Sequence, residues 1–220
     1  MAGARRRWWW FTWAGAAVAA WAMARSGPAE GPEDRPQAAV SDTPSPSASI
    51  SRSGPRPGSD YDPARFAPQV RAWAGKAGVS PQLVMAILYN ESYKPHDPDL
   101  ERAWQRHKPD SAFGIADMHR AAFEEAKQGR DFAARRWEEL PDDQDLAIEA
   151  AAWHLHDLAG QLPDRWSGPY NRDELLALGY NAGAGNMDAF ARGATPGSLA
   201  QSYLDRLRDN WSKAAAAVGA

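Results

Sequence analysis

Glu91 has the residue type and the position of a side chain that could donate and accept a proton. It lies near the end of the apolar run from Ser80 to Ser92, which begins with a preferred N-cap residue followed by proline and is therefore predicted to be a helix. One face of this helix carries three apolar residues and then the carboxylate, at Val84, Ile87, Leu88 and Glu91. Glu91 thus occupies the position at which the next core residue is expected.

The expected surroundings of Glu91 predict a raised pKa for its carboxyl group. Burial disfavours the charged form of a carboxylate, and the C-terminal end of a helix carries partial negative charge that acts in the same direction. A carboxylic acid that stays protonated near neutral pH can serve as a general acid. The segment therefore predicts acid–base chemistry at Glu91, although an exposed carboxylate at a helix end also fits this segment taken alone.

Two further segments carry residue types suited to a binding site. Residues 111–118 place small side chains before a predicted helix, which favours a turn that another group can approach closely. Residues 177–186 end a predicted helix with Tyr180 and Asn181, and glycines follow at positions 183 and 185. Because a phenol and an amide adjoin accessible backbone here, both segments are candidates for the surroundings of Glu91.

Composition limits the classes of protein to which the chain can belong. Its 220 residues, 44% hydrophobic and 24% charged, fit one ordinary globular domain with appendages. The chain has no cysteine, which excludes disulfides and cysteine-ligated metal centres. A formal net charge of −3 gives no case for nucleic-acid binding.

Residues 1–24 resemble an export signal in their charge and apolar pattern. Three arginines, at positions 5–7, precede the apolar stretch 8–24, and Ala22-Met23-Ala24 has the small-x-small form of a cleavage site. The stretch is intermediate in length between a signal-peptide core and a membrane span, so both a cleaved signal peptide and a retained membrane anchor stay open. Either one predicts an extracytoplasmic location, secreted or anchored at the cell envelope.

Residues 25–60 are rich in proline, serine and glycine and hold almost no large apolar side chains. Such a segment can bury too little apolar surface to compensate for the conformational entropy that it would lose on folding, so we predict a disordered tether. From residue 61 the apolar periodicity is helical, and no stretch alternates as a strand does. An all-α domain is therefore predicted over residues 61–220.

The expected helices begin and end at recognisable capping residues. Asn171 and Glu174 have the spacing of a capping box, and Gly129 is placed to end a helix. The stretch 93–111, polar and containing prolines, is predicted to be a loop. The predicted helices are 62–78, 80–92, 115–128, one capped by Asp142 or Asp143, one following Asn171, and one beginning around Pro196.

The three segments, together and in this order, resemble the superfamily of SLT-type lytic transglycosylases and goose-type lysozymes. The family pattern is a helix ending in Glu-Ser, then Gly-Ala-x-Gly-Leu-Met-Gln, then Ala-x-x-Tyr-Asn-Ala-Gly-x-Gly, then a tyrosine in the last helix. The resemblance covers roughly residues 65–213 and implies a lysozyme-like helical fold. The matching positions in this chain are Glu91-Ser92, 111–117, 177–185 and Tyr203.

The resemblance implies an enzyme that cleaves the β-1,4 bond between N-acetylmuramic acid (MurNAc) and N-acetylglucosamine (GlcNAc) in peptidoglycan. Glu91 would protonate the glycosidic oxygen and then, as a base, deprotonate the muramic 6-hydroxyl to close a 1,6-anhydro ring. Tyr180 would hydrogen-bond Glu91 and orient it. The resemblance also implies a monomer that acts on glycan strands and needs no metal or organic cofactor. The implied substrate-binding residues are Ser92, Ser111, Asp117, Tyr180, Asn181 and Tyr203.

Departures from the family pattern keep other functions open. Asp117 replaces the family glutamine, Ala116 the methionine and Ser111 the first glycine. A second carboxylate, such as Asp117, permits hydrolysis as in a goose-type lysozyme, in which water takes the place of the 6-hydroxyl. Further acidic residues that could serve in this way lie in the stretch 93–111. The loss of the glutamine also permits a non-catalytic peptidoglycan-binding module. A metal site is not expected at His154 and His156, because residues two apart on a helix point to different sides.

Overall fold

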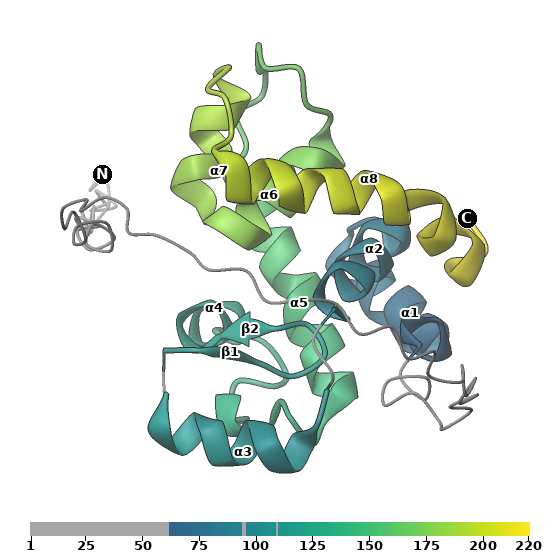
Figure 1. Ribbon diagram of the computed structural model, residues 1–220, viewed down its shortest axis with the longest axis vertical. Coiled ribbons are helices and arrows are strands. Elements are labelled where there is room, and N and C mark those ends of the chain that lie inside the picture. The colour runs from purple at the N-terminus through teal and green to yellow at the C-terminus, as the bar shows by residue number, and fades with distance from the viewer. Residues whose placement is uncertain (1–61, 94–95, 109) are drawn as a thin grey trace, which may run out of the picture. The chain divides into compact units, whose positions relative to one another are not determined.

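The computed structural model describes residues 62–93, 96–108 and 110–220 (Figure 1). The predictions of a signal peptide or anchor over 1–24 and of a linker over 25–60 lie outside these residues. The chain divides into the units Met1–Ser51 and Arg52–Ala220, and every described residue belongs to the second. Among the helices of the described ranges, none is both long enough and apolar enough to span a bilayer.

The described part of the chain is all-α apart from one short hairpin, which confirms the predicted fold class. Strands β1 and β2 pair antiparallel, with Ala112 opposite His119 and Phe113 opposite Met118. In chain order the elements are the 3-10 helix η1 (Pro63–Phe66), α1 (Ala67–Ala77), α2 (Pro81–Glu91), α3 (Pro98–His107), β1 (Ala112–Phe113), β2 (Met118–His119), α4 (Arg120–Ala126), the 3-10 helix η2 (Trp137–Glu139), α5 (Gln144–Ala159), α6 (Arg172–Ala182), α7 (Ala184–Ala191) and α8 (Ser198–Val218).

Three helices begin at the capping residues that the sequence indicated. The Ser80 hydroxyl accepts a hydrogen bond from the Leu83 amide at 3.2 Å, which opens α2. Asp143, rather than Asp142, caps α5. Asn171 and Glu174 form the predicted capping box of α6, with each side chain accepting from the other's backbone N–H.

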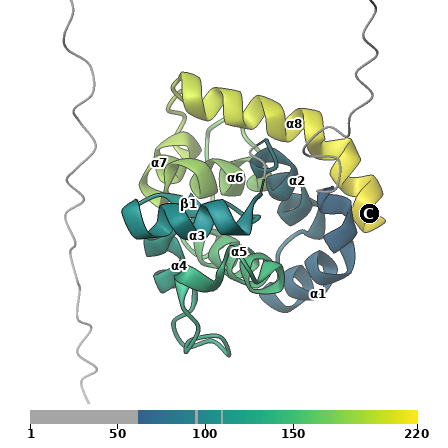
Figure 2. The same ribbon diagram turned by 60° about the horizontal axis from the view of Figure 1, so that its bottom comes forward.

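Helix α2 is the most enclosed element and carries Glu91 as its last residue. All of its residues from Leu83 to Asn90 are buried, and α8 lies across it in both views (Figures 1 and 2). Asn90 joins the two helices, because its side-chain amide donates to the Tyr203 carbonyl at 3.0 Å and accepts from Asn210 at 2.9 Å. Packing therefore fixes the backbone from which Glu91 projects.

The β1–β2 hairpin is held against η2 by Trp137. The indole of Trp137 is 1% exposed, donates to the Met118 carbonyl at 2.9 Å and meets the Phe113 ring edge-on at 5.2 Å. The chain turns between the strands at Gly114, which has a φ of 74°. A Cβ at Gly114 would lie 2.8 Å from the Leu140 carbonyl oxygen, so this is the close-approach turn that the small residues of 111–118 predicted.

Replacing Gly114 by alanine is expected to lower the free energy of unfolding by more than about 2 kcal/mol. The left-handed φ alone costs a residue with a Cβ about 1–2 kcal/mol, and the overlap with backbone atoms of Leu140 adds to it. Gly129→Ala is the matched control, because Gly129 has a φ of 71° and a Cβ added there would meet no atom within 4 Å. Urea unfolding of both variants measures the difference, and equal losses would contradict the close approach.

Three parts of the predicted element order are wrong. The helix expected over 115–128 begins only at Arg120, because the chain first forms the hairpin and its turn, in which the Asp117 amide donates to the Gly114 carbonyl at 2.9 Å. The stretch predicted as a loop contains α3, which Asp97 caps by accepting from the amides of Asp99 and Leu100. Helix α7, which follows Gly183, was not among the predicted helices, although α6 ends at Ala182 as the sequence indicated.

Candidate active site

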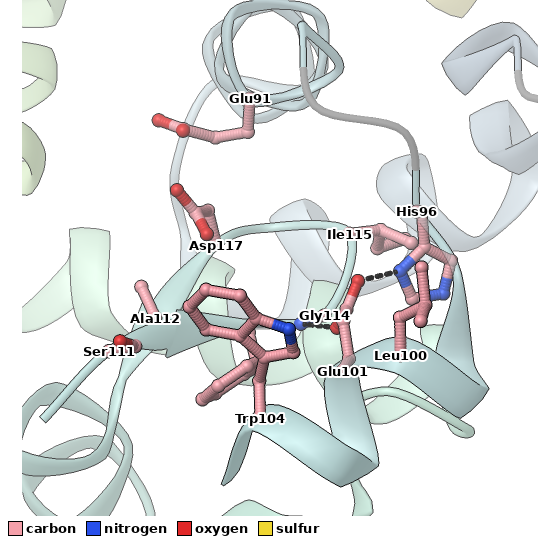
Figure 3. A pocket seen from close by; sticks show the side chains of 11 residues that line it. Glu91, His96, Leu100, Glu101, Trp104, Ser111, Ala112, Gly114, Ile115 and Asp117 are labelled. Atoms are coloured by element: carbon pink, nitrogen blue, oxygen red, sulfur yellow. Dashed lines mark hydrogen bonds and ion pairs between the residues drawn. The ribbon is translucent and has the colours of Figure 1, made fainter. Parts of the chain in front are cut away.

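Glu91 projects from the end of α2 into a cleft between this helix, α3 and the turn that joins β1 to β2 (Figure 3). The residue is half-buried, and its Oε1 accepts a hydrogen bond from the Tyr203 hydroxyl at 2.9 Å. The cleft encloses about 280 Å³. Its lining residues are Glu91, His96, Leu100, Glu101, Trp104, Ser111, Ala112, Phe113, Gly114, Ile115 and Asp117.

Asp117 places a second carboxylate on the opposite wall of the cleft. It rises from the β1–β2 turn toward Glu91 (Figure 3). Its φ of 45° makes it the one non-glycine residue with positive φ among the described residues. Aspartate tolerates this left-handed conformation better than most residues, yet backbone strain of this kind persists only where the surrounding structure enforces it.

Tyr203, and not Tyr180, donates the hydrogen bond to Glu91. The Tyr180 hydroxyl instead donates to the Ala116 carbonyl at 2.7 Å, next to Asp117 in the turn. This differs from the role that the family resemblance implied for Tyr180. Tyr180 acts on the cleft through the backbone of the turn, and Tyr203 acts through the carboxylate itself.

Both tyrosines are held in their protonated form. Desolvation, followed by the negative charge of Glu91, raises the pKa of Tyr203 well above its ordinary value. Desolvation raises the pKa of Tyr180 in the same way, with smaller contributions from the charges of Glu91 and Asp117. The two hydroxyls therefore remain hydrogen-bond donors over the whole range in which a carboxylic acid titrates.

Glu101 connects α3 to the turn that carries Asp117. Its Oε2 accepts from the Gly114 amide at 2.7 Å, and its Oε1 lies 2.6 Å from Nδ1 of His96 (Figure 3). The sequence placed Glu101 in a loop and gave it no structural role. The Asp97-Pro98 pair, a common N-cap and first-turn combination, was the signal that could have revealed this helix.

Of the other three predicted site residues, one lines the cleft and two do not. Ser111 lines it, as expected from the resemblance. Ser92 caps α2, and its hydroxyl donates to the Tyr89 carbonyl at 2.8 Å, so it acts on the end of the helix. Asn181 is exposed on α6 and does not belong to the cleft lining.

Histidine and acidic side chains form no metal-binding cluster in the described ranges. No group of three or more histidine or acidic side chains there could hold a metal ion. His154 stacks edge-on against the Tyr180 ring at 5.5 Å, whereas Nδ1 of His156 lies 2.6 Å from the Ala77 carbonyl oxygen. The two histidines thus face different neighbours, as their spacing indicated.

By its fold and its cleft, the protein is a lysozyme-like helical domain with a glutamate at the end of a buried helix. Residues 68–196, more than half of the chain, match the family described as the transglycosylase SLT domain, and the chain belongs to this family. Family membership supports a transglycosylase-type function that acts on peptidoglycan. No curated protein matches the chain significantly. Tyr203 lies beyond the matched residues, although it contacts Glu91 directly.

Proposed function

We propose that the protein is a peptidoglycan lytic transglycosylase that cleaves the MurNAc-β-1,4-GlcNAc bond and leaves 1,6-anhydromuramic ends. The observation that carries this proposal is the position of Glu91, half-buried in a cleft and hydrogen-bonded to a tyrosine whose pKa is raised. A carboxyl group held beside an open cleft supports a role as general acid, which requires a position within hydrogen-bond reach of the bound substrate.

The proposed reaction needs only one proton-transferring group. Protonated Glu91 gives its proton to the glycosidic oxygen while the bond from that oxygen to C1 of the muramic residue breaks. The Glu91 carboxylate then takes the proton of the muramic 6-hydroxyl as O6 bonds to C1. Glu91 ends protonated, as it began, and no water is consumed.

Hydrolysis is the second candidate, and Asp117 is the observation that favours it. Glycosidases commonly use two carboxylates on opposite sides of the scissile bond, one as acid and one to activate water or to attack the sugar. Glu91 and Asp117 face each other across the cleft in this way (Figure 3). In this case the products would carry reducing muramic ends.

Mass spectrometry of the products from purified sacculi separates the two reactions. We expect anhydromuramic ends from the unaltered protein, and we expect Asp117→Asn to keep this product type, because Asp117 is not needed to close the ring. Reducing ends that disappear in the Asp117→Asn variant would establish the hydrolase instead. Binding to sacculi without any released product would favour a wall-binding module.

An extracytoplasmic location fits the proposed substrate. The arginines at 5–7 and the apolar stretch 8–24 support export of the chain, and the choice between a cleaved signal peptide and a retained anchor stays a prediction from the sequence. Action as a monomer, without a cofactor, is likewise part of the proposal.

A further inference from the structure

Helix α3 exposes its large apolar side chains and turns polar ones inward. Leu100 and Trp104 are 61% and 54% exposed, whereas Gln105 is 8% exposed and approaches the Trp137 carbonyl with its amide at 3.5 Å. Glu101 likewise points inward, to the Gly114 amide. Two of the side chains that α3 turns toward the domain are therefore polar, and its two large apolar side chains stay exposed.

The two exposed residues form one surface. Leu100 and Trp104 are four residues apart, so their side chains are neighbours on the same face of α3. Single exposed apolar residues are common and need no explanation, but an adjacent pair at the rim of a cleft is typical of a binding surface. Both residues line the same cleft as Glu91 and Asp117, and Figure 3 shows Trp104 rising from α3 on the side away from Glu91.

We propose that the Leu100–Trp104 face of α3 is a sugar-stacking platform that binds a glycan residue next to the bond facing Glu91. This inference rests on the proposed function, because it takes the substrate of that same cleft as the occupant. An indole ring offers a flat apolar surface to the C–H face of a pyranose ring, while the amides and hydroxyls of the sugar stay free for hydrogen bonds. The Lys108 ammonium lies 5.0 Å from the centre of the Trp104 ring, a cation–π contact that steadies the indole.

The charges of the cleft support a neutral sugar as the occupant. Its acidic lining residues, Glu91, Glu101 and Asp117, come from three different elements. Such a lining disfavours anionic ligands such as acidic phospholipid headgroups or nucleic acid. The GlcNAc residue of the glycan carries no such charge, and it presents both an apolar ring face and hydrogen-bonding groups.

Binding to insoluble peptidoglycan tests the platform without relying on catalysis. The experiment uses the full chain carrying Glu91→Gln, to which Trp104→Ala, Trp104→Phe or Leu100→Ala is added. We expect Trp104→Ala to weaken co-sedimentation with sacculi at least about fivefold, and Trp104→Phe to retain most of the binding, because a phenyl ring still stacks. Leu199→Ala is the control, since Leu199 is 85% exposed at the start of α8, outside the cleft, and should leave binding unchanged.

The outcomes separate the platform from the proposed function. Equal binding by the Trp104→Ala and Leu199→Ala proteins would overturn the platform, even if the protein with Glu91 intact cleaves sacculi. Loss of binding in Trp104→Ala supports the platform, even if no variant ever cleaves. The same proteins are also mixed with vesicles of zwitterionic phospholipid. If Trp104→Ala loses binding to the vesicles but not to sacculi, the face binds a membrane and the proposal is overturned. If thermal unfolding shows that Trp104→Ala does not fold, the binding of Leu100→Ala to sacculi is compared with that of Leu199→Ala. Weaker binding by Leu100→Ala supports the platform, and equal binding overturns it.

Discussion

Replacing Glu91 by glutamine is expected to reduce the clearing of purified peptidoglycan by about 10²–10⁴-fold, which is the usual contribution of a positioned general acid or base. Glutamine keeps the shape of the side chain and can still accept the hydrogen bond from Tyr203 through its amide oxygen. It cannot donate a proton to the glycosidic oxygen or take one from the 6-hydroxyl. Turbidity of a sacculus suspension measures the loss.

Two controls separate a chemical role of Glu91 from a structural one. Glu125→Gln removes an exposed carboxylate on α4, outside the cleft lining, and should clear peptidoglycan at the original rate. Thermal unfolding should show Glu91→Gln to be at least as stable as the unaltered protein, because catalytic carboxylates are commonly kept at some expense in stability. Equal clearing rates for the Glu91→Gln and Glu125→Gln proteins would eliminate Glu91 as the acid.

The arrangement of the cleft explains how one domain can fix two opposed carboxylates. Glu91 is set by α2, which is enclosed by α8, and Asp117 is set by a turn that three separate contacts restrain. Glu101 and Tyr180 contact the turn itself, Trp137 contacts Met118 at the start of β2, and these three residues lie on different elements. Rigid support of this kind suits the proposed chemistry, because groups that are already in place need no rearrangement during a reaction.

The features that the sequence predicted correctly are those that depend on local chemistry. Ser80 and Asn171 cap their helices through bonds to residues three positions away, so a short window contains the whole signal. The half-buried position of Glu91 at the end of α2 agrees with the helix and the periodicity that were read from the same short window. The family itself was recognised from three short motifs, two of which supply Glu91 and the lining residues from Ser111 to Asp117.

The features that the sequence missed depend on contacts that spacing does not reveal. Helix α3 buries Gln105, holds Glu101 against the Gly114 amide and exposes Leu100 and Trp104, so its pattern contradicts the usual rule for an amphipathic helix. The hairpin has only two residues in each strand, too few for alternation to be recognised. The resemblance named Tyr203 as a site residue but not as the hydrogen-bond donor to Glu91, because the two lie 112 residues apart and meet through the packing of α8 on α2.

Tyr203→Phe is expected to lower the rate of peptidoglycan cleavage by about tenfold or more, because hydrogen bonds to charged groups contribute about 1.5–3 kcal/mol. The substitution removes one hydroxyl and leaves the ring that packs in the core at 2% exposure. Glu91 would then lose the donor that holds its Oε1 at 2.9 Å. The raised pKa of Tyr203 keeps this donor protonated, so its effect on the rate should persist at alkaline pH, where an exposed tyrosine would ionise.

Tyr180→Phe is the matched comparison, since it removes a hydroxyl from the other tyrosine close to Glu91. This change should lower the free energy of unfolding by about 1 kcal/mol, because the Ala116 carbonyl loses its 2.7 Å partner. It should affect the rate less than Tyr203→Phe does, because Tyr180 contacts the turn and not the carboxylate. Initial clearing rates and urea unfolding of both variants measure the two effects. A larger rate loss in Tyr180→Phe, at unchanged stability, would return the orienting role to Tyr180 and make Tyr203 a packing residue.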